Sequence, residues 1–197
     1  TTPVTPETPE APEAPVWSPL ALNTAAVTNN PTLNWSWNVP TSPTPGATYG
    51  GYGFALYNGD TVLASGTLGA DVQQYSYAAP ATGTYRLFVW ILDTTGVSAP
   101  APPAVAGCEY RDTTLDTAAP VIVVNGEGFT SNGNITTPTF TTTETDLIYS
   151  WVVNADGAAV TISNSAELTP MFTFLKDGTY QFTLTATDAL GNITTTT

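Results

Sequence analysis

The chain has 197 residues, enough for two domains of about 80 to 100 residues each, and sixteen Asp plus Glu against three Lys plus Arg give it a formal net charge of −13 at pH 7. Such an acidic chain does not attract phosphate backbones or anionic lipid, so nucleic acid is excluded as a partner, and without an apolar run of about 18 residues we expect no membrane insertion. The absence of His excludes an imidazole base, a Ser-His-Asp triad and a His-ligated metal.

Residues 1–15 read TTPVTPETPEAPEAP, with proline at short intervals. Because proline has a fixed φ and no backbone N–H, this composition predicts an extended, polyproline-like segment that serves as a stalk or tether. A disordered tail is the alternative interpretation.

A first β-rich module is predicted over residues 16–105. Alternating apolar and polar residues from Leu33 to Val39 predict a half-buried strand. The tripeptide Asn58-Gly59-Asp60 predicts a hairpin turn, because Asn and Gly accept positive φ. Further strands are expected at 52–57, 61–65, 73–77, 85–92 and 97–101.

Residues 106–119 are interpreted as a short acidic linker that contains the single cysteine, Cys108. Cys108 has no partner for an intrachain disulfide, so it is an unreactive thiol or it pairs between chains. Acidic neighbours disfavour its thiolate, and with one thiol and no His we expect no enzymatic activity. A lone cysteine in a chain rich in Thr, Pro, Asn and Gly is typical of an exported microbial surface protein.

A second module is predicted over residues 120–197, and no helical periodicity occurs at any useful length. Turn signals come from Asp156-Gly157 and Lys176-Asp177-Gly178. Short strands with turn signals every 8 to 12 residues predict an antiparallel β-sandwich in each module. The strands of the second module are expected at 120–124, 139–142, 147–153, 160–163, 171–175, 180–187 and 193–197.

The segments 83–96 and 178–191 align without a gap, so the chain contains an internal repeat. Both copies begin with Gly-Thr-Tyr. Tyr85 and Tyr180 therefore stand at the start of a late strand, where a tyrosine corner ties its hydroxyl to the preceding connection. Rings such as Trp35, Trp37 and Trp151, together with Tyr149 and Tyr180, are expected to fill the cores.

The outward positions of this repeated strand differ between the copies. Gln181, Thr183, Thr185 and Thr187 in the second copy match Arg86, Phe88, Trp90 and Leu92 in the first. We call the latter four residues the ridge. A strand that is apolar on both sides must be covered on both faces or expose a patch, so the ridge predicts an interface. Its cover is the Pro-rich segment 40–50, another module or subunit, or a ligand such as a sugar on Trp90.

The second module begins with Asp116-Thr-Ala-Ala-Pro120 and ends with Asp177-Gly-Thr-Tyr180 through Thr187-Asp188-Ala-Leu-Gly-Asn192. These motifs resemble the bacterial Ig-like repeats of large surface adhesins, which are near relatives of PKD and fibronectin type III modules. The likeness covers nearly all of the second module, and the first module shares its closing segment. The resemblance implies an all-β chain of two tandem antiparallel Ig-like β-sandwich domains, with the extended Pro-rich segment before them.

Calcium is the candidate cofactor. Hard cations take carboxylate and carbonyl oxygens from loops, and in the adhesin repeats that this chain resembles Ca²⁺ rigidifies the junction between modules. The matching acids are Asp93, Asp112, Asp116 and Asp188. The spacing of these four residues differs from that of an EF-hand loop, and a solvated acidic linker is the alternative interpretation.

Three sequons, at Asn34, Asn134 and Asn192, are candidate glycosylation sites. Taken together, these features predict a non-enzymatic, extracellular structural protein of a prokaryotic surface. The first hypothesis is a subunit of a pilus-like filament that binds copies of itself by β-strand addition and through the ridge. One alternative is a stalk fragment of a calcium-stiffened adhesin. The other is a carbohydrate-binding module that uses Trp90 and the group Tyr49-Tyr52-Tyr57 to bind a glycan or a host surface.

Overall fold

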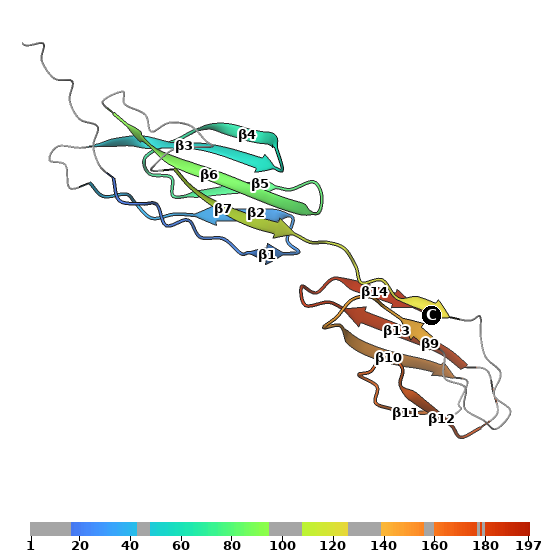
Figure 1. Cartoon of the computed structure of the whole chain (residues 1–197). Helices are drawn as coiled ribbons and strands as arrows, with labels where there is room; N and C mark the ends of the chain where they lie inside the picture. The colour runs from blue at the N-terminus through green and yellow to red at the C-terminus, as the bar shows by residue number, and fades with distance from the viewer. Residues whose placement is uncertain are drawn as a thin grey trace, which may run out of the picture. The chain divides into compact units, whose positions relative to one another are not determined.

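The structure is a computed structural model that describes residues 17–42, 48–94, 108–125, 139–155, 160–176, 178 and 180–197. Every regular element in these residues is a β-strand, from β1 to β14 (Figure 1), so the predicted all-β class is confirmed. The chain divides into two compact units. Unit 1 comprises Thr1–Val27 and Thr32–Leu115, and unit 2 comprises Thr28–Pro31 and Asp116–Thr197.

Unit 1 contains a five-stranded sheet and a two-stranded sheet. The central strand β6 lies between β7 and β3, and the order across the larger sheet is β1-β7-β6-β3-β4. The neighbours β3–β4, β3–β6 and β6–β7 are antiparallel, and β2 pairs antiparallel with β5. The strands are β1 (Val27–Thr28), β2 (Thr32–Ser36), β3 (Tyr49–Asn58), β4 (Thr61–Leu68), β5 (Gln74–Ala78), β6 (Gly83–Asp93) and β7 (Cys108–Leu115).

The core of unit 1 consists of alternate residues from both sheets, as period two requires. Strand β2 contributes Leu33 and Trp35, each 1% exposed. Strand β6 contributes every second side chain, each at most 5% exposed: Tyr85, Leu87, Val89 and Ile91. Trp37 lies in the same core and contacts the ring of Tyr52 edge-on. The alternation does not continue to Val39, which is 52% exposed, because β2 ends at Ser36.

Unit 2 contains a three-stranded sheet of order β10-β13-β14 and the two-stranded pairs β11–β12 and β8–β9. Its core is centred on Trp151, Phe172 and Leu184. The indole N–H of Trp151 donates to the carbonyl of Glu167 at 3.0 Å, so this buried ring has its polar group satisfied. The strands are β8 (Val123–Asn125), β9 (Thr139–Thr141), β10 (Ile148–Ala155), β11 (Val160–Ser163), β12 (Met171–Phe174), β13 (Tyr180–Thr187) and β14 (Ile193–Thr196).

Both predicted tyrosine corners are present. The hydroxyl of Tyr85 donates to the carbonyl of Ala81 at 2.6 Å, and that of Tyr180 donates to the carbonyl of Lys176 at 2.5 Å. In each unit the hydroxyl reaches back four residues, so a tyrosine at or near the start of its strand is tied to the segment before that strand.

The interpretation of residues 106–119 as a linker is wrong for most of its length. Cys108–Leu115 forms β7, which pairs with β6 along its whole length. The pattern of a half-buried strand is hidden because inward positions hold Glu109 and Arg111, and only Thr113 and Leu115 are buried. The backbone hydrogen bonds between β7 and β6 do not depend on the type of side chain, so a largely polar segment can form a strand of this sheet. The predicted strand at 97–101 and the Pro-rich segment 1–15 lie outside the described residues.

Candidate contact face of unit 1

The ridge lies on the outer side of the five-stranded sheet. Phe88, Trp90 and Leu92 are half-buried and Arg86 is exposed, whereas the residues between them point into the core. Strand β6 therefore has apolar side chains on both of its faces, and those of the ridge are partly exposed.

Two small residues of β3 lie opposite the ridge and leave room for its rings. Gly53 pairs with Trp90 and Ala55 pairs with Phe88. A Cβ on Gly53 would come within 2.1 Å of Cε2 of Trp90, so the indole lies directly across the backbone of β3. Substituting any larger residue at position 53 would displace this ring.

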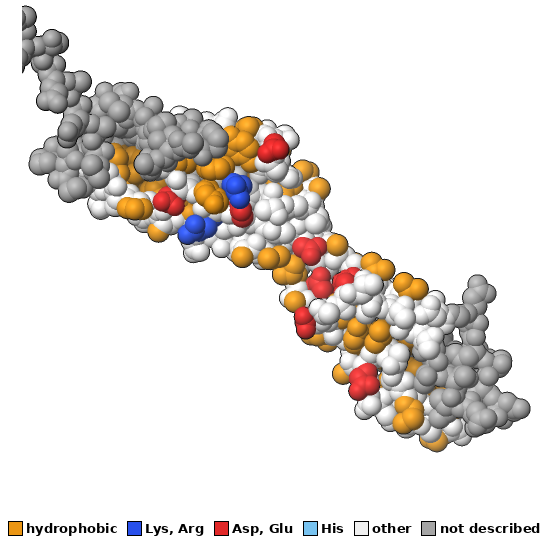
Figure 2. Space-filling view, in the orientation of Figure 1, with side chains coloured by type: hydrophobic (Ala, Val, Ile, Leu, Met, Phe, Trp, Pro, Cys, Tyr) orange, Lys and Arg blue, Asp and Glu red, His pale blue; other side chains and the backbone are white. Residues whose placement is uncertain are grey.

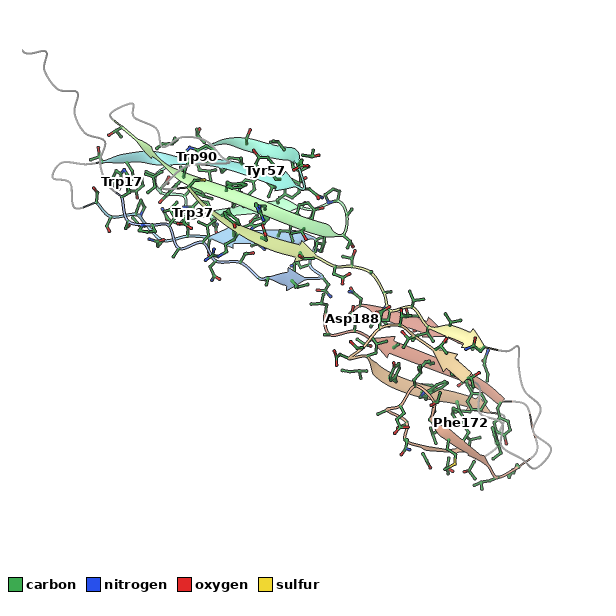
Figure 3. The ribbon with its side chains drawn as sticks, viewed as in Figure 1. Trp17, Trp37, Tyr57, Trp90, Phe172 and Asp188 are labelled. Atoms are coloured by element: carbon green, nitrogen blue, oxygen red, sulfur yellow. The ribbon has the colours of Figure 1, made fainter. Side chains whose placement is uncertain are left out.

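Two tyrosines from neighbouring strands complete the surface, which we call the aromatic face (Tyr57, Phe88, Trp90 and Tyr110). The ring of Tyr57 on β3 meets Phe88 edge-on at 5.5 Å, and that of Tyr110 on β7 lies 5.4 Å from Phe88 on the other side. Tyr110 is 46% exposed. Figure 3 labels Tyr57 and Trp90 on their adjacent strands, and Figure 2 shows charged side chains beside hydrophobic ones on this part of unit 1.

An ion pair borders the aromatic face. Nε and Nη2 of Arg86 donate to the two carboxylate oxygens of Asp112 at 2.7 and 2.8 Å, and the guanidinium carbon lies 4.5 Å from the ring centre of Tyr110. The hydrogen bonds from Arg86 lower the pKa of Asp112. The fork-shaped guanidinium therefore fixes the carboxylate and the tyrosine ring together.

Sequence reasoning found the ridge but missed its partners. Tyr110 falls in the predicted linker 106–119, and the sequence pattern groups Tyr57 with Tyr49 and Tyr52. That grouping is wrong, because Tyr52 is 0% exposed in the core of unit 1 and Tyr57 lies on the opposite side of β3. Counting positions within β3 separates them, since residues five apart in a strand point to opposite faces.

Cys108 pairs with Trp90 across β6 and β7 and is half-buried. Burial, and then the charge of Glu109, raises the pKa of its thiol to about 11. The group therefore remains protonated at neutral pH, which favours the unreactive-thiol interpretation over an interchain disulfide.

The predicted calcium ligands have local partners where their side chains are described. Asp112 is paired with Arg86, and an oxygen of Asp116 accepts from the backbone N–H of Ala118 at 3.0 Å. Asp188, labelled in Figure 3, accepts from the N–H of Leu190 and from two nitrogens of Asn192. Within the described ranges, no group of three or more acidic or Cys residues is placed to hold a metal. The side chain of Asp93 is outside those ranges.

The sequons differ in the availability of their amide nitrogens. Asn34 is exposed on β2, and its Nδ2 donates to the carbonyl of Thr32 at 3.1 Å. Nδ2 of Asn192 donates both to Asp188 and to the carbonyl of Asp116, so a sugar at that atom would disrupt the turn. Asn134 is not among the described residues.

The described part of the chain contains no helix that is long and apolar enough to cross a membrane. Neither the protein-family models nor the curated proteins include a match to the sequence. Among solved structures, the fibronectin(III)-like modules of CbhA from Clostridium thermocellum align over 89% of this chain and 90% of that chain, with 14% identity and a TM-score of 0.37. A likeness of this size assigns no family, so the β-sheet architecture is established by strand pairing alone.

Proposed function

We propose that this chain is a non-catalytic extracellular subunit of a repeating surface structure, and that the aromatic face of unit 1 is the surface through which one copy contacts another. The observation that carries the proposal is the row of partly exposed rings around Phe88, bordered by the ion pair of Arg86 and Asp112. Tyr, Trp, Phe and Arg are the residues enriched in the centres of protein interfaces.

The two repeats provide an internal comparison. At the positions of Phe88 and Trp90, unit 2 has Thr183 and Thr185 on β13. Both strands are central in their sheets, so the fold of such a strand does not itself require large outward rings. This difference supports a role in contact for the aromatic face, with unit 2 as the spacer.

Trp90→Thr tests this proposal, because it places the residue of the matching position in unit 2 on the aromatic face. We expect the variant to fold cooperatively and to lose ordered assemblies in negative-stain electron microscopy of the concentrated full chain. Val152→Thr is the matched control, since Val152 is an exposed apolar residue (54%) on a strand of unit 2. Assemblies that persist in Trp90→Thr would contradict the proposal, as would a collapse of unit 1 stability that makes the ring part of the core.

Carbohydrate binding is a second candidate function for the same face. It is favoured by the indole of Trp90 lying across Gly53, with the hydroxyl residues Ser65 and Thr67 on the next strand. A flat ring beside hydroxyl groups suits the apolar face and rim of a neutral sugar. Weak glycan binding by the wild-type chain that is absent in Trp90→Thr would support this function, in place of contact between copies.

Calcium stiffening of a stalk remains a prediction of the resemblance to adhesin repeats. The carboxylate of Asp188 already accepts hydrogen bonds from its own turn, so a cation there would compete with those donors. The aromatic face has no role in that hypothesis. For this reason we rank the calcium-stiffened stalk below assembly.

A further inference from the structure

Strand β4 is an exposed edge of the five-stranded sheet. Among the described residues it pairs only with β3, and six of its eight residues are exposed. An edge strand presents a row of N–H and C=O groups from alternate residues, which can pair with another strand.

Proteins usually protect such edges with charges, with proline, with bulges or by keeping them short. The sequence of β4, TVLASGTL, contains no charged residue and no proline. Its register with β3 skips Leu63, which forms a bulge near the start, and then runs regularly from Ala64 to Leu68. The opposite edge, β1, has two residues.

Strand β4 carries no charge, and this determines whether a second acidic copy can pair with it. Two copies with a net charge of −13 each repel one another, so a contact between copies is least opposed where the surface carries no unpaired acid. The regular part of β4 is such a surface, with Asp60 and Asp71 lying outside both of its ends. It also satisfies the symmetry of a dimer, because an uncharged strand pairs with itself without opposing charges.

We infer that the segment Ala64–Leu68 pairs antiparallel with the same segment of a second copy, through a two-fold axis at Gly66. Full overlap places Ser65 of one copy opposite Thr67 of the other. The axis is perpendicular to the sheet, so the two five-stranded sheets become continuous and both aromatic faces point to the same side. This inference concerns a different surface from the proposed function and does not depend on it.

The pairing predicts a weak dimer that strengthens with salt. Five residues of each strand bury less than roughly 1,200 Å², the lower limit of a standard interface. We therefore expect a dissociation constant between about 10 µM and 1 mM. Salt screens the repulsion between the acidic copies. Sedimentation equilibrium of the full chain at low and high ionic strength measures both effects.

Charge substitutions test the register itself. Ser65→Glu with Thr67→Glu places like charges opposite each other twice, and we expect dimerisation to weaken about tenfold. Ser65→Lys with Thr67→Glu places opposite charges in the same two pairs, so the dimer should recover. Thr161→Glu with Ser163→Glu is the matched control, since these residues are exposed on β11 of unit 2, and it should leave dimerisation unchanged.

Hydrogen exchange of the wild-type chain locates the contact without any variant. Amides of Ala64–Leu68 should gain protection as the concentration rises, and Trp90→Thr should still dimerise. A chain that is monomeric over the whole range would overturn the inference. It would also be overturned by a dimer that responds equally to both charge pairs, or by one that protects other strands. A dimer that is lost only in Trp90→Thr would instead support contact through the aromatic face.

Discussion

At the scale of single residues, Arg86 connects the carboxylate of Asp112 with the ring of Tyr110 on the surface of unit 1. Its guanidinium binds the carboxylate of Asp112 on β7 in bidentate geometry, and it also lies over the ring of Tyr110. Both contacts are on the side of β7 that faces outward. Arg86 therefore orders the exposed ring that borders Phe88, which a lysine at this position would do less well because it lacks a planar fork.

The ion pair should make a small, pH-dependent contribution to the stability of unit 1. The folded pKa of Asp112 is lowered from its ordinary value of 3.8, mainly by the hydrogen bonds from Arg86. A lowered pKa gives stability that is fully present above about 3.8 and is lost as the pH falls through the folded value. Because both side chains are more than 40% exposed, solvent screening limits the contribution to about 0.2–1 kcal/mol.

Asp112→Asn should thus be less stable than the wild type at pH 7, and the difference should shrink as the pH falls below 3.8. Urea unfolding at a series of pH values measures it. A difference that is constant with pH would show that Asp112 acts through packing and that its charge has no role.

At the scale of elements, the tyrosine corners hold the start of the two matching strands, β6 and β13. The ring of Tyr85 is 0% exposed, whereas that of Tyr180 is half-buried. When a buried tyrosine loses its hydroxyl, water cannot take the place of that hydroxyl at the backbone carbonyl. The free-energy cost of losing the hydrogen bond therefore rises with burial.

Tyr85→Phe should therefore destabilise unit 1 by about 1 kcal/mol, and Tyr180→Phe should destabilise unit 2 by less. Thermal unfolding followed by calorimetry of the full chain compares the two variants. Equal losses would mean that burial does not set the strength of these hydrogen bonds.

At the scale of the whole molecule, each unit has its own hydrophobic core. Unit 1 is built around Trp35, Tyr52 and Leu87, and unit 2 around Trp151, Phe172 and Leu184. Among the described residues, the core of unit 2 contains fewer fully buried side chains than that of unit 1, so a single truncation there removes a larger share of the described core.

Phe172→Ala should destabilise unit 2 by about 3–5 kcal/mol, because it removes a fully buried ring from a close-packed cluster. Hydrogen exchange of the full chain should show faster exchange in β10 and β13 while β3 and β6 keep their protection. Exchange that accelerates equally in both units would indicate that they unfold as one.

The sequence by itself determined the all-β class, the repeated strand with its tyrosine corner, and the alternation that directs Leu87 inward and Trp90 outward, because period-two patterning reports which face of a strand is buried. It could not show that Tyr57 and Tyr110 flank Phe88, or that Gly53 lies beneath Trp90. Only tertiary structure decided these contacts, together with the place of β7 in the sheet and the open edge at β4. The physical reason is that strands pair through backbone hydrogen bonds that every residue type can make, so the pattern within one strand does not specify its neighbours.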